Sequence, residues 1–407
     1  GLEAFGLYHK ALALASAGDF EGADDILSGR AAGNLAVNRR GAIAQIEILS
    51  QLERNDDAIS FIDRSFVPGR DLEIDDLRRR LVAGEPLPFT VARNATDGIA
   101  EVFYTMATAV NGEAAPAYTM LHSRAAAYLR PDNTEAILLT ANLLEQQQQF
   151  DLAVSTYAMV QPTNPAFYIA EIGRAEATQA AGRSAESLEI LQALARSHGT
   201  QIAVQTALGD GLRRAEKFAE AKVAYDAAIA TLPEPPPASN WPLFYSRGIC
   251  LERTGDFAAA DADMRLALSL NPNEPQVLNY LGYSLVDRGE KLEEALGMIK
   301  RAVLARPDNG AILDSLAWAY FRLGRYEDAL IPMEKASLLM AVDPVVTDHL
   351  GDVYWAVGRT REAEYQWRRA LSYEPTEADA TRIRLKLEKG LDAVREAEGA
   401  KPIVPAD

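Results

Sequence analysis

The sequence has a single cysteine and no long apolar run. Cys250 has no second cysteine to pair with, which excludes an internal disulfide, and we interpret it as a small buried hydrophobic residue within a helix. No stretch of about 18 consecutive apolar residues occurs, so the sequence predicts no membrane-spanning helix. The remaining composition, 48% hydrophobic and 24% charged, is ordinary for a globular protein.

Basic residues are scarce relative to acidic ones. The 407 residues include 41 lysines and arginines against 58 aspartates and glutamates, which gives a formal net charge of −17. A surface of that sign repels both the phosphate backbone of nucleic acids and anionic lipid headgroups. We therefore expect neither nucleic acid nor an anionic membrane surface as the main partner.

Motifs that carry catalysis or hold a cofactor are missing as well. The sequence has no phosphate-binding glycine loop, no His-Glu-x-x-His and no Cys-x-x-Cys. One cluster of metal-ligand residue types occurs at helical spacing, Asp348, His349 and Asp352. Asp348 and Asp352 share a helix face, but His349 points about 100° away from it. We expect no metal there, no cofactor, and no enzymatic activity.

What the sequence does contain is an internal repeat. Small residues recur at equivalent places in successive apolar patterns, with spacings of 34, 34, 34, 39, 34, 35 and 34 residues. These positions are Ala107, Ala141, Ala175, Gly209, Gly248, Gly282, Ala317 and Gly351. A fixed period near 34 residues with paired helical patterns is typical of stacked two-helix repeats.

One unit, residues 310–343, illustrates the pattern. Leu313, Ala317 and Tyr320 recur at helical spacing and form one apolar stripe, and Gly324 then interrupts the helix. Ala329 begins the inner face of a second helix. Because the distance between packed helices depends on side-chain size at their contact, Ala317 and Ala329 allow a close approach. Two such helices cannot bury their apolar faces alone, so each unit needs its neighbours.

These units resemble the consensus of the tetratricopeptide repeat family. The resemblance implies antiparallel helix pairs that stack into a right-handed superhelix with a concave, peptide-binding groove. We therefore predict an all-α, right-handed superhelical solenoid of about ten tetratricopeptide helix pairs, with one extra joint helix and a C-terminal capping helix. The stretches 278–283 and 350–355 look like tetratricopeptide proteins of alphaproteobacteria, many of which are exported. This favours a periplasmic or envelope location, with a cytoplasmic one as the alternative.

The period divides the chain into five parts. Residues 1–65 read as a degenerate N-terminal array, and residues 66–99 as a joint with one extra helix and a proline-containing loop. Residues 100–377 read as the main array of eight repeats, and residues 378–398 as a capping helix with a polar outer face. The tail, residues 399–407, is expected to be disordered. Because the joint breaks the period, we expect the N-terminal array to reorient against the main array.

The predicted groove is aromatic and acidic. In the family, three positions on the first helix of each repeat line the concave face, and their spacing of four and then three residues puts them on one side of the helix. The residues of this sequence that match those positions and that we expect to bind a partner are Tyr245, Asn279, Tyr283, Asp314, Trp318, Phe321, Asp348, Asp352 and Trp355. The alternative for Trp318 and Trp355 is that they only fill the packing between repeats.

We predict a non-catalytic scaffold that binds an extended or helical segment of a partner protein in this groove. The acidic and aromatic lining favours an apolar or aromatic segment with basic flanks. Two alternatives remain open: a structural subunit that assembles through its edges or convex surface, and a regulatory part of a larger enzyme. We also expect that Gly1 is not the natural start, because the first helix has no polar capping segment before it.

Overall fold

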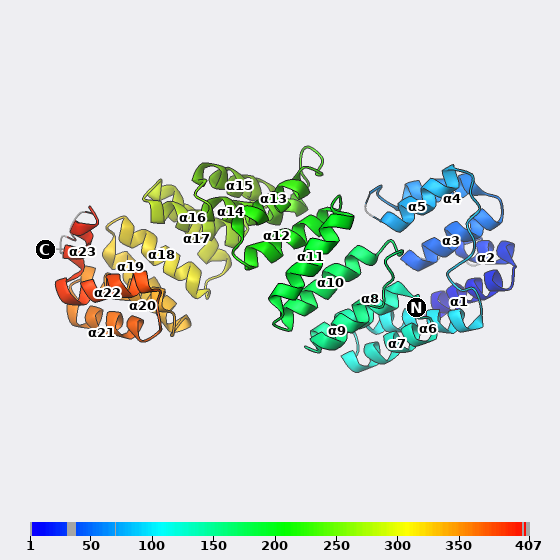
Figure 1. Cartoon of the computed structure of the whole chain (residues 1–407), viewed down its shortest axis with the longest axis horizontal. Helices are drawn as coiled ribbons and strands as arrows, with labels where there is room; N and C mark the ends of the chain where they lie inside the picture. Colours follow the sequence, from blue (N-terminus) through cyan, green and yellow to red (C-terminus); the bar gives the residue numbers. More distant parts are fainter. Residues whose placement is uncertain (1, 31–37, 70, 401–402, 404–407) are drawn as a thin grey trace. The chain divides into compact units, whose positions relative to one another are not determined.

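The structure is a computed structural model that describes residues 2–30, 38–69, 71–400 and 403 (Figure 1). Every regular element in that part of the chain is helical, which confirms the all-α prediction. The chain divides into two compact units, an N-terminal unit of residues 1–216 and a C-terminal unit of residues 217–407. None of the described helices is long and apolar enough to cross a membrane.

The N-terminal unit consists of consecutive helices, most of which pack against the next helix along the chain. Its helices are α1 (Leu2–Ser16), α2 (Phe20–Leu27), α3 (Arg39–Gln51), α4 (Asn55–Ser65), α5 (Leu72–Val82), α6 (Ala95–Val110), α7 (Pro116–Leu129), α8 (Thr134–Gln146), α9 (Phe150–Tyr157), α10 (Phe167–Ala180), α11 (Ser184–His198) and α12 (Ile202–Arg214). The extra helix predicted within residues 66–99 is α5.

The rest of the predicted joint differs from the expectation, because the segment that follows α5 belongs to the core. Leu87, Val91 and Ala92 are buried together with the apolar side chains of α1–α5. The carboxylate of Glu47 accepts a hydrogen bond from the backbone N–H of Thr90 at 2.7 Å. Burial raises the pKa of Glu47 to about 7, although the bonds from Thr90 act in the opposite direction. The segment is extended and has no helical hydrogen bonds of its own, so α3 supplies partners for it.

The N-terminal helices are also tied to the beginning of the main array. The Tyr8 hydroxyl of α1 donates to the Glu101 carboxylate of α6 at 3.0 Å. Arg40 of α3 pairs with the same carboxylate at 2.7 Å, and both Arg40 and Glu101 are buried. Neither charge can be exposed to water without breaking the other's pairing. These contacts tie α1 and α3 to α6, where the sequence led us to expect reorientation.

The C-terminal unit continues the repeat with more regular pairs. Its elements are α13 (Phe218–Ile229), a short 3₁₀ turn (Ala238–Asn240), α14 (Trp241–Arg253), α15 (Phe257–Leu270), α16 (Pro275–Arg288), α17 (Leu292–Ala305), α18 (Gly310–Arg322), α19 (Tyr326–Leu339), α20 (Pro344–Ala356), α21 (Thr360–Leu371), α22 (Glu377–Lys389) and α23 (Leu391–Ala397). The two helices of each pair from α14/α15 to α20/α21 contact each other, and each pair contacts the next.

The C-terminal end differs from the single capping helix expected over residues 378–398. Thr376 caps the start of α22 by accepting from the backbone N–H of Asp379. The helix then ends at Gly390, whose φ of 80° and ψ of 160° only glycine adopts readily. A second helix, α23, follows next to it (Figure 1). Of the predicted tail, Ile403 is buried in the core, and residues 401–402 and 404–407 lie outside the described part.

The small residues at the pair contacts have the steric role that the sequence predicts. Ala317 and Ala329 are fully buried between α18 and α19. A Cβ atom added to Gly282 would lie 2.6 Å from Cγ1 of Ile299, and one added to Gly351 would collide with the indole of Trp367. Real Cβ atoms do not approach so closely, so these pairs require glycine at the contact.

A second periodic contact joins successive pairs of the C-terminal unit. The side chains of Arg301, Lys335 and Arg369 each donate to a backbone carbonyl in the turn that closes the preceding pair. The acceptors are Pro272, Pro307 and Ala341. Carbonyls just beyond a helix C-terminus carry partial negative charge, so a cation placed there is favourable. This bond recurs with the repeat period and ties each pair to the one before it.

We predict that Gly351→Leu destabilises the C-terminal unit by at least about 1–3 kcal/mol, because a side chain would be forced into the space of Trp367. All four tryptophans, Trp241, Trp318, Trp355 and Trp367, lie in this unit, so urea unfolding followed by tryptophan fluorescence reports on it selectively. The control is Gly297→Ala in α17, where no described atom lies within 4 Å of the added Cβ. It should raise stability by about 0.5–1 kcal/mol. Equal effects of the two substitutions would contradict the packing role of Gly351.

Candidate functional site

The nine predicted groove residues lie on four successive first helices of the C-terminal unit. Tyr245 is on α14, and Asn279 and Tyr283 are on α16. The remaining six are on α18 and α20: Asp314, Trp318, Phe321, Asp348, Asp352 and Trp355. Residues one repeat apart stand at equivalent places on neighbouring helices, so side chains of one repeat reach those of the next.

Four of the nine are buried in the free protein. Asp314, Trp318, Phe321 and Asp352 are at most 8% exposed, and the other five are partly buried. Trp318 stacks on Phe321 with ring centroids 4.8 Å apart and on His349 of the next repeat at 4.0 Å. Much of this aromatic surface therefore packs repeat against repeat, the alternative role considered for Trp318.

Two of the acidic groove residues bind a buried lysine of α22. Lys386, whose side chain is 0% exposed, places Nζ 2.7 Å from Asp348 and 2.6 Å from Asp352. Asp352 also accepts a hydrogen bond from the indole N–H of Trp367 at 2.9 Å. Burial and the charge of Asp352 raise the pKa of Asp348, although Lys386 acts in the opposite direction. A buried ion pair of this kind requires both partners, since removal of either leaves an uncompensated charge.

His349 joins the third acidic residue. Its Nδ1 lies 2.9 Å from Oδ1 of Asp314, and both residues are buried. Burial lowers the pKa of His349, but the charge of Asp314 and the hydrogen bond to it outweigh that effect, so the net shift is upward. Asp348 and Asp352 act in the same direction from one turn of α20. The chain itself thus supplies a partner to each of these carboxylates: His349 to Asp314, and Lys386 to Asp348 and Asp352. A preference for basic partner segments would therefore need other acidic side chains.

An open hollow remains beside this cluster, with a volume of about 440 Å³. Three groove residues line it: Tyr283, Trp318 and Asp348. The other lining residues are Asp287, Arg322, Pro344, Val345, His349, Pro375, Asp379, Arg382 and Ile383. Apolar and aromatic groups thus share the hollow with the exposed carboxylates of Asp287 and Asp379 and with the guanidinium groups of Arg322 and Arg382. Such a site can receive an apolar side chain whose neighbours are basic.

Next to the hollow, part of the predicted groove is covered by the chain itself. The indole N–H of Trp355 donates to Asp392 of α23 at 2.9 Å, and the guanidinium of Arg395 lies 5.3 Å from the ring centroid of Phe321. We call Phe321 and Trp355 the covered face. Sequence reasoning placed both in an open groove and did not foresee that α23 turns back onto them.

Tyr245 and Asn279 do not line the hollow. Tyr245 contacts the ring of Tyr280 edge-on at 5.8 Å, and it lies 6.3 Å from Trp241 on its own helix. The side-chain oxygen of Asn279 is buried and has no hydrogen-bond partner among the described protein atoms. Tyr245 thus contributes to packing between α14 and α16, and neither residue is among the three that line the hollow.

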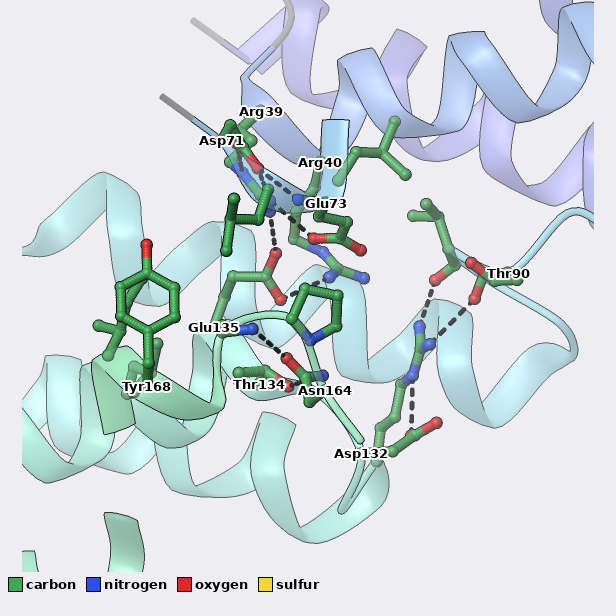
Figure 2. Close-up of a pocket in the computed structure, with 18 of the residues that line it drawn as sticks. Arg39, Arg40, Asp71, Glu73, Thr90, Asp132, Thr134, Glu135, Asn164 and Tyr168 are labelled. Atoms are coloured by element: carbon green, nitrogen blue, oxygen red, sulfur yellow. Dashed lines mark hydrogen bonds and ion pairs between the residues drawn. The ribbon is translucent and has the colours of Figure 1, made fainter. Parts of the chain in front are cut away.

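A second hollow, of about 470 Å³, lies in the N-terminal unit and was not foreseen (Figure 2). Figure 2 shows Arg39 and Arg40 pointing toward Glu135, and Asn164 beside Thr134. Arg39 also pairs with Asp71 at 2.6 Å. Both arginines stand at the N-terminus of α3, where the helix dipole disfavours cations. In the sequence, this unfavourable placement is the only sign that Arg39 and Arg40 need carboxylate partners from other helices.

Comparison with known proteins identifies the repeat. The tetratricopeptide repeat model matches residues 206–275 and 280–337. The chain contains tetratricopeptide repeats. It is 32% identical over 212 residues to the TPR repeat-containing protein PA4667 of Pseudomonas aeruginosa, a match that covers 52% of this chain and 35% of that protein. The chain thus spans about a third of the length of this curated relative.

Solved structures show the same repeat fold. A chain of the APC/C hetero-tetramer Cut9-Hcn1 superposes with a TM-score of 0.53 at 14% identity, covering 95% of this chain and 83% of that chain. A tetratricopeptide repeat protein from Parabacteroides merdae gives a TM-score of 0.48 at 16% identity, covering 63% and 97%. The all-helical structure, the matching repeat model and the superposition with the TM-score of 0.53 confirm the prediction of an all-α tetratricopeptide fold. Such repeats generally serve as scaffolds for protein interactions, through the extended surfaces that stacking creates.

Within the tetratricopeptide repeats, the cluster of Asp348, His349 and Asp352 has protein partners for each side chain. His349 faces Asp314, and the two carboxylates share Lys386. Across the described ranges, no group of three or more histidine, cysteine, aspartate or glutamate side chains has the arrangement of a metal site.

We predict that the C-terminal unit loses stability as the pH rises above about 6.5, the ordinary pKa of histidine. The folded-state pKa of His349 is raised, so its stabilising contribution is complete below the unfolded value and is lost as the pH passes through the folded value. Urea unfolding followed by tryptophan fluorescence at several pH values should show this loss, and Asp314→Asn should diminish it.

The control for this pH experiment is Asp308→Asn, which changes a carboxylate that is 79% exposed and pairs with Lys335. It should leave the pH dependence of the parent unchanged. An unaltered pH dependence in Asp314→Asn would show that the His349–Asp314 pair does not cause it.

Proposed function

We propose that this chain is a non-catalytic scaffold whose C-terminal repeats bind a segment of a partner protein in the open hollow between α16, α18, α20 and α22. The observation that carries the proposal is the hollow of about 440 Å³ at equivalent positions of successive repeats, lined by Tyr283, Trp318 and Val345. A single large aromatic side chain buries about 150–250 Å² on leaving water. That corresponds to about 4–6 kcal/mol as an upper limit, so one such residue can dominate affinity.

The charges around the hollow specify what should flank the apolar residue. Arg382 and Lys386 already neutralise Asp348 and Asp352, which removes these two carboxylates from the charges available to a partner. Asp287 and Asp379 line the hollow and are exposed. Basic residues of a partner would meet these two, and such exposed pairs contribute only about 0–1 kcal/mol each. They would set the rate of association and the preference for basic flanks more than the affinity.

A second candidate function, assembly through the outer surface, is favoured by exposed apolar side chains on the second helices. Leu304 and Leu338 occupy equivalent places in successive repeats and are 83% and 81% exposed. Ile331 and Tyr365 form a second such pair, with exposures of 76% and 68%. Large apolar side chains repeated along one surface are typical of protein interfaces. The hollow remains the first candidate because it combines apolar, aromatic and charged groups at one place.

The test uses a peptide library of fixed length displayed on phage and selected against the whole chain. We expect enrichment of sequences with an aromatic or large apolar residue flanked by lysine or arginine. Val345→Lys should weaken the binding of a selected peptide at least tenfold, or about 1.4 kcal/mol, because the lysine fills the hollow and repels basic flanks. Val345 is 43% exposed and begins α20, so this substitution leaves the core intact.

The matched control is Val223→Lys in α13, a residue that is 66% exposed and does not line the hollow. It should bind the selected peptide with the affinity of the parent. Selection of acidic peptides, or equal binding by both variants, would contradict the proposed site.

A further inference from the structure

The segment from Gly390 to Ala397 occupies part of the predicted groove. Leu391 is fully buried, and it belongs to the same apolar core as the buried residues of α18–α21. Asp392 accepts from the indole of Trp355, and Arg395 lies over Phe321. Five consecutive residues, 391–395, thus supply a buried apolar side chain, a hydrogen bond and a cation–π contact. The covered face therefore already holds a short amphipathic helix.

This intramolecular contact rests on few anchors. α23 has seven residues, far fewer than the 12–15 at which an isolated helix becomes marginally stable. Leu391 and Val394 are its buried residues. Beyond them, Glu398 pairs with Arg382 of α22 at 2.8 Å, and the buried Ile403 donates its N–H to Asp392 at 3.0 Å. Segments with so few buried contacts open with a small free energy, long before the whole unit unfolds. Displacement of α23 thus does not require the repeats to unfold.

We propose that the covered face is a second binding surface, for a short amphipathic helix of the partner protein, and that α23 occupies it in the free chain. The proposal rests on the function proposed above, and it names the class of partner more closely. The partner helix carries two apolar residues three positions apart, an acidic residue for the indole N–H of Trp355, and a cation for the ring of Phe321. This is the chemistry that Leu391, Asp392, Val394 and Arg395 present to the same face.

The two surfaces are contiguous, which favours a partner that uses both. Trp318 lines the open hollow and stacks on Phe321 of the covered face at 4.8 Å. A partner whose aromatic residue fills the hollow brings its adjoining helix to the covered face at high effective concentration. α23 has the same advantage in the free chain, because only Gly390 separates it from α22. Release of α23 is then a step that the partner drives by occupying the hollow first.

The test weakens the intramolecular contact without changing the covered face. In Gly390→Ala, a Cβ would lie 2.9 Å from the ring of Trp355, and the φ of 80° is unfavourable for alanine. The probe is a fluorescein-labelled peptide with the sequence of residues 390–400, titrated into the whole chain and followed by fluorescence anisotropy. We expect the Gly390→Ala chain to bind it at least tenfold more tightly than the parent chain does.

Two controls separate displacement from general strain. Gly358→Ala has a similar φ of 79°, but no described atom lies within 4 Å of its added Cβ, so it should bind the peptide like the parent. A peptide with serine in place of Leu391 and Val394 should bind the Gly390→Ala chain at least tenfold more weakly. If Gly390→Ala does not fold, Asp392→Ala in the chain provides the same test, because it removes the acceptor of the Trp355 indole.

Equal peptide binding by Gly390→Ala and parent chains, with both folded, would overturn the proposal and make α23 a permanent part of the core. Dimers of Gly390→Ala that exchange α23 would also overturn it, because the occupant would then be a second copy of the chain. Val345→Lys should leave this peptide's binding to the Gly390→Ala chain unchanged. Failure at the open hollow and failure at the covered face are therefore distinguishable.

Discussion

The structure depends on the close contact between each two-helix repeat and its neighbours. A helix pair has apolar side chains on more sides than its own partner can cover, so stability comes from stacking. Gly282 and Gly351 let the helices of a pair approach, and the cation ladder of Arg301, Lys335 and Arg369 ties successive pairs together. Because equivalent positions of neighbouring repeats face each other, stacking uses several of the side chains that the sequence predicts to line a groove.

That overlap explains why the groove is only partly open. Trp318 stacks on His349 of the following repeat, and Asp352 pairs with Lys386, which stands one repeat further on. After α21, the corresponding contacts come from two further helices: α22 supplies a buried lysine to Asp352, and α23 covers Trp355. What remains accessible is the hollow beside Tyr283 and Val345.

The sequence predicts the fold well because helical spacing and the repeat period are local signals. In the C-terminal unit, the small residues Gly248, Gly282, Ala317 and Gly351 lie on the first helices of four packed pairs, α14/α15 to α20/α21. The sequence does not show which predicted groove residues are covered by side chains of the next repeat. Trp318 and Tyr283 occupy equivalent positions, yet only Trp318 has a histidine of the next repeat stacked on it. That difference arises from contacts between residues about 30 apart.

Other features escaped the sequence for related reasons. The helix α22 ends at Gly390, where a Cβ atom would lie 2.9 Å from the ring of Trp355, a residue about 35 positions earlier. Leu87 and Val91 are buried in a segment that exchanges hydrogen bonds with side chains of α3. The sequence did not predict this burial, because the nearby glycine and prolines are typical of an open loop. The hollow at Arg39 and Arg40 unites residues from α3, α5, α8 and the loop before α10, and no single stretch of sequence carries it.

The most direct test of the central claim is hydrogen exchange of the whole chain, with and without a peptide selected against it and extended by an amphipathic helix. The account predicts slower exchange in the first turns of α20 and α22, around Val345 and Asp379, together with faster exchange of residues 391–398 as α23 is released. Protection confined to the outer helices α17, α19 and α21, with no change in α23, would contradict it.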